Sequence, residues 1–129
     1  IRVWKELSMR FTIDLPPVTK KNSQQIIKAG NRMMIIPSKK YREYEAQCMP
    51  FLKPLHIDYP VNIEAIYYMP TKRRVDLCNL HEALCDVLVK HGVIEDDNSE
   101  IIVSMDGSRV RYDRKNPRTE VIIEMVETP

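Results

Sequence analysis

Residues 61–97 read VNIEAIYYMPTKRRVDLCNLHEALCDVLVKHGVIEDD, and this stretch carries the clearest structural pattern in the chain. Apolar side chains alternate with their neighbours over residues 61–69, which predicts a strand with one buried face. The apolar positions then recur every three or four residues, as they do on one face of a helix. Asp76 stands at an N-cap position and Gly92 at a stop, so the sequence predicts a helix over residues 77–90.

Weaker patterns on either side complete the expected fold. Further strands are expected at residues 10–15, 33–36, 101–105 and 120–125, and a first helix from the N-cap Ser38 to Pro50. A polar loop is expected from Lys20 to Gly30, and a basic connection before the last strand. Strands dispersed among two main helices predict an α+β fold with one mixed, mostly antiparallel sheet. We assign a single domain to residues 9–127 and interpret residues 1–8 as a leader or a cloning remnant.

The bulk composition excludes several protein classes. The 129 residues are 43% hydrophobic and 29% charged, which is typical of a soluble globular chain. They contain no apolar run long enough to span a membrane and no secretory signal pattern, so cytoplasmic residence is expected. Cys48, Cys78 and Cys85 are an odd number without a CxxC pair, which indicates reduced thiols. A net charge of +2 is too small to indicate a nucleic-acid partner, so local clusters must decide.

Three aspartates near the ends of the predicted helix are candidate metal ligands. Asp76 precedes the helix, and Asp96 and Asp97 follow it in an acidic turn. Carboxylates are the hard oxygen ligands of divalent ions that activate water at phosphate. The segment after the helix is long enough to return alongside it, so Asp97 and Asp96 are expected to approach Asp76. The spacing permits this cluster without requiring it, and the alternative is an N-cap and a solvated turn.

Residues 73–101, RRVDLCNLHEALCDVLVKHGVIEDDNSEI, resemble the core of the RusA family of Holliday-junction resolvases, the crossover junction endodeoxyribonucleases. The shared features are a basic run, D-L-x-N-L, an aspartate within the helix at Asp86, a glycine after it, and paired aspartates. The early segment PPVTKKNS, residues 16–23, is similar to the N-terminal strand and loop of the family. The resemblance extends from Met9 to Glu127.

This resemblance implies a RusA-like fold and an activity. It implies a symmetric homodimer, of a kind often encoded by prophages, that cuts four-way DNA junctions in recombination and repair. The implied metal is Mg²⁺, with Mn²⁺ as an alternative ion. Carried over by position, Asp76 matches the first catalytic aspartate of the motif and Asp97 the last, with Asp96 as an acidic neighbour.

Two positions depart from the family pattern. Cys78 replaces the second aspartate of D-L-D-N-L, and Glu82 stands where a basic residue is expected. A thiol is a poor ligand for Mg²⁺, so either the site lacks one carboxylate or Glu82 or Asp106 supplies it. Glu82 could reach toward Asp76 from the next helical turn, and the alternative for Glu82 is a solvated helix face. Cys78 itself is interpreted as a small packing residue.

Clustered cations are the candidates for DNA phosphate contacts, because loops with several cations bind phosphates more often than single lysines do. They are Lys20, Lys21, Lys28 and Arg32 in the first loop, Lys39, Lys40 and Arg42 on the first helix, Lys72, Arg73 and Arg74 before Asp76, and Arg109, Arg111, Arg114, Lys115 and Arg118 before the last strand. Tyr41 and Tyr44 are expected in the core rather than as base-stacking platforms.

Two alternatives to a magnesium-dependent junction endonuclease remain open from the sequence. The first keeps the fold and loses cleavage because of Cys78, which leaves a protein that only binds junctions. The second is an interaction domain that binds no nucleic acid and uses its acidic turn to contact a partner protein.

Overall fold

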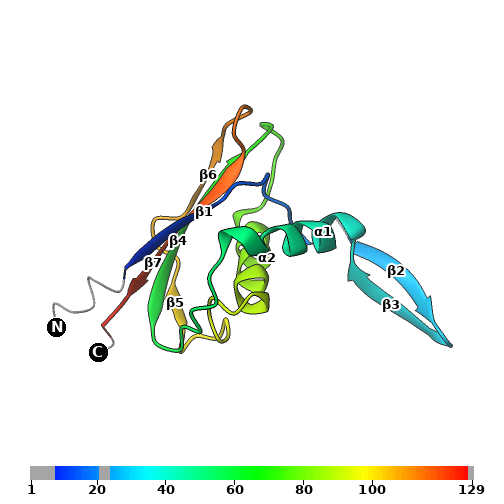
Figure 1. The fold of residues 1–129 in the computed structure, drawn as a ribbon. Coiled ribbons are helices and arrows are strands. Elements are labelled where there is room, and N and C mark those ends of the chain that lie inside the picture. Colours follow the sequence, from blue (N-terminus) through cyan, green and yellow to red (C-terminus); the bar gives the residue numbers. More distant parts are fainter. Residues whose placement is uncertain (1–7, 21–23, 128–129) are drawn as a thin grey trace.

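Strand β4, Val61–Met69, is the central element of the computed structural model, which describes residues 8–20 and 24–127 (Figure 1). Val61, Ile63, Ala65 and Tyr67 are buried on one face of β4, while the residues between them are partly exposed. This pattern confirms the strand predicted over residues 61–69. Residues 1–7, which make up most of the predicted leader, lie outside the described residues.

The sheet around β4 is mixed and has five strands. β7 (Arg118–Met125) lies between β1 (Met9–Ile13) and β4, and it pairs antiparallel with both. The other edge of β4 pairs in parallel with β5 (Ile102–Ser104) near its start and with β6 (Arg109–Tyr112) near its end. The expected α+β class with a mixed sheet is confirmed, and parallel pairs make up the β5 and β6 side.

The helices α1 (Lys39–Gln47) and α2 (Leu77–Lys90) lie on the same face of this sheet, followed in the case of α1 by a short 3₁₀ turn, η3 (Met49–Phe51) (Figure 1). The buried side chains of both helices form one core cluster with the inward face of β4 and β7. Tyr41 and Tyr44 belong to this core, as expected, and the Tyr41 hydroxyl donates to the carbonyl of Ala83 at 3.3 Å. Ser38 accepts from the amide of Tyr41, which confirms the predicted N-cap.

A partly buried polar pair joins α2 to β4 beside this core. The hydroxyl of Tyr67 lies 2.8 Å from Nδ1 of His81. Burial lowers the pKa of His81 below its ordinary value, so the imidazole is neutral at neutral pH. The pair fixes the position of the helix over the strand without burying a charge.

A separate hairpin departs from the predicted fold. β2 (Gln24–Ala29) and β3 (Arg32–Pro37) pair antiparallel and project away from the sheet and helices; we call residues 24–37 the arm (Figure 1). Gly30, with φ of 63°, occupies the first of two turn positions, where a type II′ hairpin turn favours glycine. The expected loop over residues 20–30 is therefore wrong for residues 24–29. The strand was missed because its residues do not alternate between a buried and an exposed face.

A second strand was missed in the basic connection before β7. All four residues of β6 are exposed, so its sequence lacks the apolar alternation that reveals a strand. The expected strands elsewhere are present with shifted ends: β1 ends at Ile13 rather than residue 15, and β7 begins at Arg118 rather than residue 120. Cys48, Cys78 and Cys85 are free thiols, as expected. In the described part of the chain, no helix is long and apolar enough to cross a membrane.

Backbone hydrogen bonds hold residues 92–95 beside the C-terminal end of α2. Gly92 has φ of 71°, which allows the chain to leave the helix, and its carbonyl accepts from the amide of His56 at 2.8 Å. The amide of Ile57 donates to the carbonyl of Val93 at 3.1 Å, and the amide of Glu95 donates to the carbonyl of Ile57 at 2.9 Å. These bonds tie residues 92–95 to the segment before β4.

Replacing Gly92 tests this stop. Gly92→Ala forces a side chain into the left-handed region and places its Cβ about 3.1 Å from the His56 ring. We expect the free energy of unfolding to fall by about 1–2 kcal/mol, measured by urea denaturation. Gly92→Asn carries the same Cβ but tolerates this conformation better, so it should lose less; an equal loss would assign the effect to the His56 contact.

Candidate functional site

An open pocket of about 450 Å³ lies where the end of α2 meets the start of α1. Its wall comes from four segments: the segment after β1, α1, the second half of α2 and the acidic turn that follows it. The lining residues are Lys20, Tyr41, Arg42, Glu45, Asp86, Val89, Lys90, Asp96 and Asp97. The pocket thus combines acidic and basic side chains in one hollow.

The acidic turn supplies two adjacent carboxylates to this pocket. Asp96 accepts from the backbone amide of Asp97 at 2.8 Å and from Nδ2 of Asn98 at 3.0 Å. These hydrogen bonds hold the pKa of Asp96 below its usual range and fix its carboxylate in the ionised form. None of the ion pairs formed by the described residues includes Asp97, so its charge has no paired cation. Two carboxylates at neighbouring positions can bind a cation from solution.

Lys20 connects the segment that follows β1 to α2. Its Nζ lies 2.6 Å from Oδ2 of Asp86 and 5.8 Å from the centre of the Tyr41 ring. The hydrogen bond to Asp86 raises the pKa of Lys20, and the charges of Glu82 and Glu45 act in the same direction. Asp86 is therefore engaged in an ion pair.

Asp76 lies at the opposite end of α2. It occupies the predicted N-cap position with extended backbone, but its side chain makes no capping bond and instead accepts from Nδ2 of Asn79 at 3.2 Å. Ten residues of helix separate Asp76 from Asp86, which corresponds to about 15 Å along the axis. Asp76 does not line the pocket that contains Asp86, Asp96 and Asp97.

The pocket brings Asp96 and Asp97 together with Asp86, and Asp76 is not among its lining residues. The segment after Gly92 does not continue along α2, because its backbone bonds to residues 56 and 57 keep it at the C-terminal end of the helix. The extended length of this segment would allow it to reach the start of α2. The sequence did not reveal that its backbone bonds instead to residues 56 and 57.

The two candidate substitutes for the missing aspartate, Glu82 and Asp106, lie on different elements: Glu82 in α2 and Asp106 after β5. Cys78 is exposed in the first turn of α2, so its expected packing role is wrong. Glu82 is exposed one turn further and faces Lys20 closely enough for its charge to act there. Asp106 follows β5, where its carbonyl accepts from Nδ2 of Asn62 at 3.2 Å. Among the described residues, no group of three or more His, Cys, Asp or Glu could hold a metal ion.

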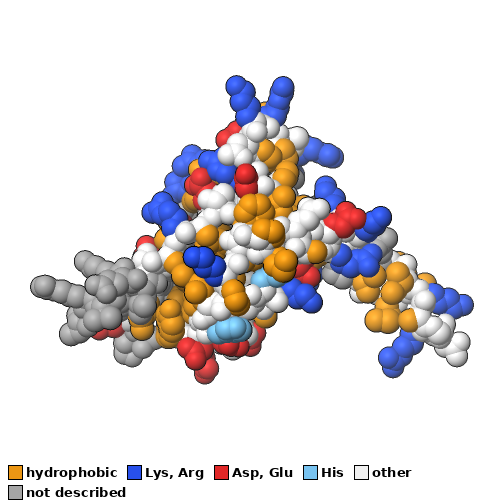
Figure 2. All heavy atoms as spheres, viewed as in Figure 1, with side chains coloured by type: hydrophobic (Ala, Val, Ile, Leu, Met, Phe, Trp, Pro, Cys, Tyr) orange, Lys and Arg blue, Asp and Glu red, His pale blue; other side chains and the backbone are white. Residues whose placement is uncertain are grey.

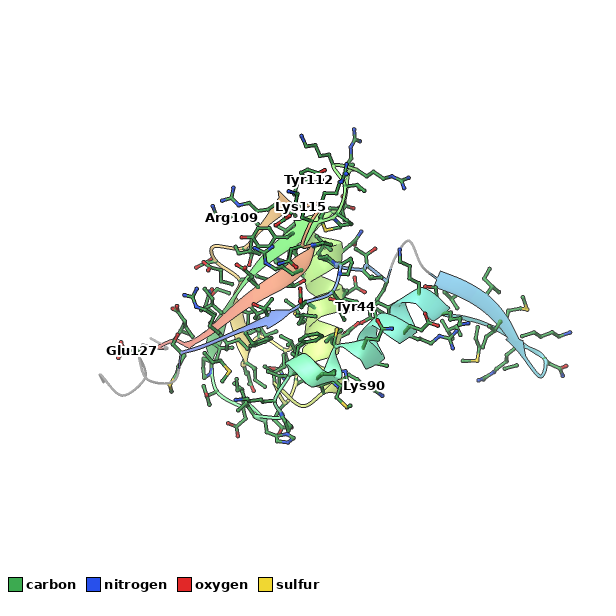
Figure 3. All side chains as sticks on the ribbon, turned by 45° about the horizontal axis from the view of Figure 1, so that its top comes forward. Tyr44, Lys90, Arg109, Tyr112, Lys115 and Glu127 are labelled. Atoms are coloured by element: carbon green, nitrogen blue, oxygen red, sulfur yellow. The ribbon has the colours of Figure 1, made fainter. Side chains whose placement is uncertain are left out.

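Cations from two parts of the sequence meet near Asp76. Lys72, Arg73 and Arg74 are exposed between β4 and α2, and Arg111 of β6 pairs in register with Tyr68 near the end of β4. Nζ of Lys72 lies 5.2 Å from the centre of the Tyr112 ring. Figure 2 shows Lys and Arg side chains gathered at this end, and Figure 3 places Arg109, Tyr112 and Lys115 there, away from Lys90. The fold therefore builds a basic end that the sequence presented as two separate clusters.

The remaining candidate cations differ in their surroundings. The guanidinium of Arg118 forms ion pairs with Glu120 at 2.9 Å and Asp113 at 3.0 Å, and it lies 3.8 Å from the centre of the Tyr68 ring. These contacts occupy its charge. Lys39 forms a long, exposed pair with Glu43. The exposed cations are Lys28, Arg32, Lys39, Lys40, Arg42, Arg109, Arg111, Arg114 and Lys115. Lys21 lies outside the described residues.

Glu45 lines the pocket, although the sequence pattern did not single it out. It follows Tyr41 by one helical turn, and the only signal is its place beside a buried residue on a short helix. Its backbone carbonyl lies 2.6 Å from Nε2 of His91, which joins the end of α2 to α1 and helps to shape the pocket.

The donor atoms of the pocket fit a hard divalent cation. Mg²⁺ prefers oxygen and is commonly held by one or two carboxylates, with water and substrate phosphate completing its shell. Asp96 and Asp97 provide two carboxylates, and Lys20, Arg42 and Lys90 line the same pocket, where cations can contact phosphate. Cys85 is not a competing ligand, because burial, with the charges of Asp97 and Asp86, raises the pKa of its thiol to about 12.

Comparison with known proteins gave one family. The family model described as Endodeoxyribonuclease RusA matches residues 14–124, which is most of the chain. The comparison with curated proteins gave no match.

Proposed function

Because the chain belongs to the RusA endodeoxyribonuclease family, whose members act on Holliday junctions, we propose that it is a metal-dependent, structure-selective endonuclease that resolves four-way junctions in recombination and repair. The observation that carries the proposal is the pocket in which Asp96 and Asp97 lie beside Lys20, Arg42 and Lys90. Carboxylates for a metal and cations for phosphate are the two requirements of phosphodiester cleavage. Because the proposed substrate is DNA, the cytoplasm is the proposed site of action.

We assign the metal contact to Asp97, with Asp96 beside it. Asp97 has no paired cation among the described residues, and hydrogen bonds hold Asp96 ionised. Mg²⁺, or Mn²⁺ in its place, would supply charge neutralisation at the phosphate and a lower pKa for water. Because one chain gathers only two such carboxylates on this turn, the other contacts fall to water, to substrate phosphate or to a second subunit.

Basic side chains at both ends of α2 would hold the DNA. Lys20, Arg42 and Lys90 would contact phosphates around the pocket, and Lys72, Arg73 and Arg74 would contact phosphates at the basic end. Asp76 would act as a second acidic point, exposed beside these cations. About 15 Å between Asp76 and Asp86 corresponds to roughly four to five nucleotides at 3.4 Å each. A single strand can therefore follow α2 from one end to the other.

A homodimer suits this substrate. A four-way junction has two equivalent strands to cut, and a two-fold symmetric pair of subunits presents two equivalent pockets. This assembly belongs to the proposal, together with the prophage origin that the resemblance implies.

One observation favours a second candidate function. Cys78 is exposed in the first turn of α2, at the position where the family pattern has an aspartate. A thiol there contributes no oxygen ligand to a metal, which would leave a protein that binds junctions without cutting them. An interaction domain that contacts only a protein partner is the remaining alternative, and it would bind branched DNA no better than linear duplex.

The substitution Asp97→Asn tests the metal contact. It removes a charge that faces phosphate, so junction binding should be retained or improved while cleavage falls by at least about 100-fold. Gel-shift titration and single-turnover cleavage of a labelled junction measure the two effects. Asp58→Asn, an exposed aspartate outside the pocket, serves as the matched control and should cut normally. Loss of both binding and cleavage by Asp97→Asn would contradict the assignment.

The substitution Cys78→Asp tests whether the chain lacks a catalytic carboxylate. Wild-type protein and the variant are incubated with a four-way junction in Mg²⁺ and, separately, in Mn²⁺. If Asp97 and Asp96 suffice with other ligands, the wild type cuts and Cys78→Asp changes the rate less than about tenfold. A wild type that is inactive in both ions, with a variant that cuts, would support the junction-binding alternative. Cys85→Ala, which removes a buried thiol, controls for general loss of a cysteine.

A further inference from the structure

We propose that the arm is a DNA-opening element: its more exposed apolar face covers bases that unstack at the branch point, and its cations hold the phosphates on either side. This inference rests on the proposed function, because it takes branched DNA as the partner. The proposed role of residues 24–37 is separate from the cleavage step.

One face of the arm is apolar and unusually exposed. Ile26 pairs in register with Ile35, and Lys28 pairs with Met33, so these four side chains share one face. The exposed fractions are 68% for Ile26, 70% for Met33 and 67% for Ile35, whereas Ile27 and Met34 on the other face are exposed by 38% and 44%. Exposed apolar side chains in such a group mark an interaction surface. Isoleucine and methionine are among the side chains that DNA-bending proteins insert between base steps.

The charge of the arm indicates a polyanion as its partner. Between Asp14 and Glu43 the sequence contains no acidic residue, while the cations in this interval are Lys20, Lys21, Lys28, Arg32, Lys39, Lys40 and Arg42. Figure 2 shows this combination on the arm, where hydrophobic and basic side chains lie together without acidic ones. Two arms facing one another would bring like charges together, so a direct contact between the arms of two copies is disfavoured.

The position of the arm agrees with this partner. Lys20 precedes β2 and Arg42 lies four residues after Ser38, and both line the pocket that contains Asp96 and Asp97. The arm therefore begins at the rim of the proposed cleavage site. A DNA strand with its phosphate in the pocket must pass the root of the arm.

The dimensions of the arm also suit DNA. Six residues per strand give a length of about 20 Å, which corresponds to roughly six base pairs. A two-stranded ribbon fits the major groove of a duplex. Base pairs at a branch point lose a stacking neighbour when the junction opens, and the cost of this loss falls when aliphatic side chains cover the exposed base faces.

The test replaces the apolar face while keeping the strands. The triple variant Ile26→Thr, Met33→Thr, Ile35→Thr removes the hydrophobic contact, and threonine retains a high strand propensity. A junction with 2-aminopurine at the branch point reports unstacking by increased fluorescence, and the titration is done without Mg²⁺ so that no strand is cut. Met49→Thr, at a methionine that is 63% exposed outside the arm, is the matched control.

We expect wild-type protein and the Met49→Thr control to raise the 2-aminopurine fluorescence, and the triple variant to leave it at the level of the free junction. Junction affinity should change by less than about threefold, because the phosphate contacts remain. An unchanged fluorescence response in the triple variant would overturn the inference. Conversion of a wild-type dimer to a monomer by the triple variant, measured by light scattering, would also overturn it and assign the face to a second copy.

Failure of this inference and failure of the proposed function give different results. A wild type that neither prefers junctions to linear duplex nor cuts them contradicts the proposed function, whatever the arm does. A wild type that cuts junctions without raising the fluorescence contradicts only the role of the arm.

Discussion

The shared buried face of β4 and α2 is the constraint on which the rest of the molecule depends. Alternate side chains of β4 and the apolar face of α2 pack together in the core, and Tyr67 is hydrogen-bonded to His81 near the end of β4. The hydrophobic effect supplies most of this attraction, and the neutral polar pair fixes where along the strand the helix lies. Once these two elements are placed, the basic turn between them and the acidic turn after them must lie at opposite ends of α2. The length of α2 thus separates the basic turn from the acidic turn.

Because of this separation, the two ends of α2 carry different sets of charged side chains. The cations before Asp76 lie with those of β6 at one end, and Asp96 and Asp97 lie with Lys20, Arg42 and Lys90 at the other. Backbone bonds from residues 92–95 to residues 56 and 57 maintain this arrangement, because they prevent the acidic turn from following the helix back to its start. A phosphate backbone that lies along α2 would meet cations at both ends, whereas the adjacent carboxylates of Asp96 and Asp97 lie only at the pocket. Such an arrangement favours cleavage at a defined position.

The sequence was sufficient for elements that build the core and insufficient for those that do not. The β4 and α2 patterns were readable because burial imposes a period of two on a strand and of 3.6 on a helix. β6 and β2 have no buried face of this kind, so their sequences resemble loops, whereas the apolar run at residues 33–36 did predict β3. The site was only partly predictable because its geometry depends on contacts between distant residues. The resemblance named Asp76, Asp96 and Asp97. Their arrangement depends on the bridge between Ile57 and Ile94, which leaves no local sequence pattern. The paired Lys20 and Asp86, separated by 66 positions, were equally invisible.

Strand-resolved mapping of the cuts in a four-way junction tests the central claim most directly. Each of the four strands is end-labelled in turn, and wild-type protein is added with Mg²⁺ to the junction and, in parallel, to a linear duplex of the same sequence. The account predicts nicks in one pair of opposite strands, at symmetric positions close to the branch point, with the linear duplex left intact. Cuts distributed along both substrates at similar rates, or in a single strand only, would contradict a structure-selective, two-fold symmetric endonuclease.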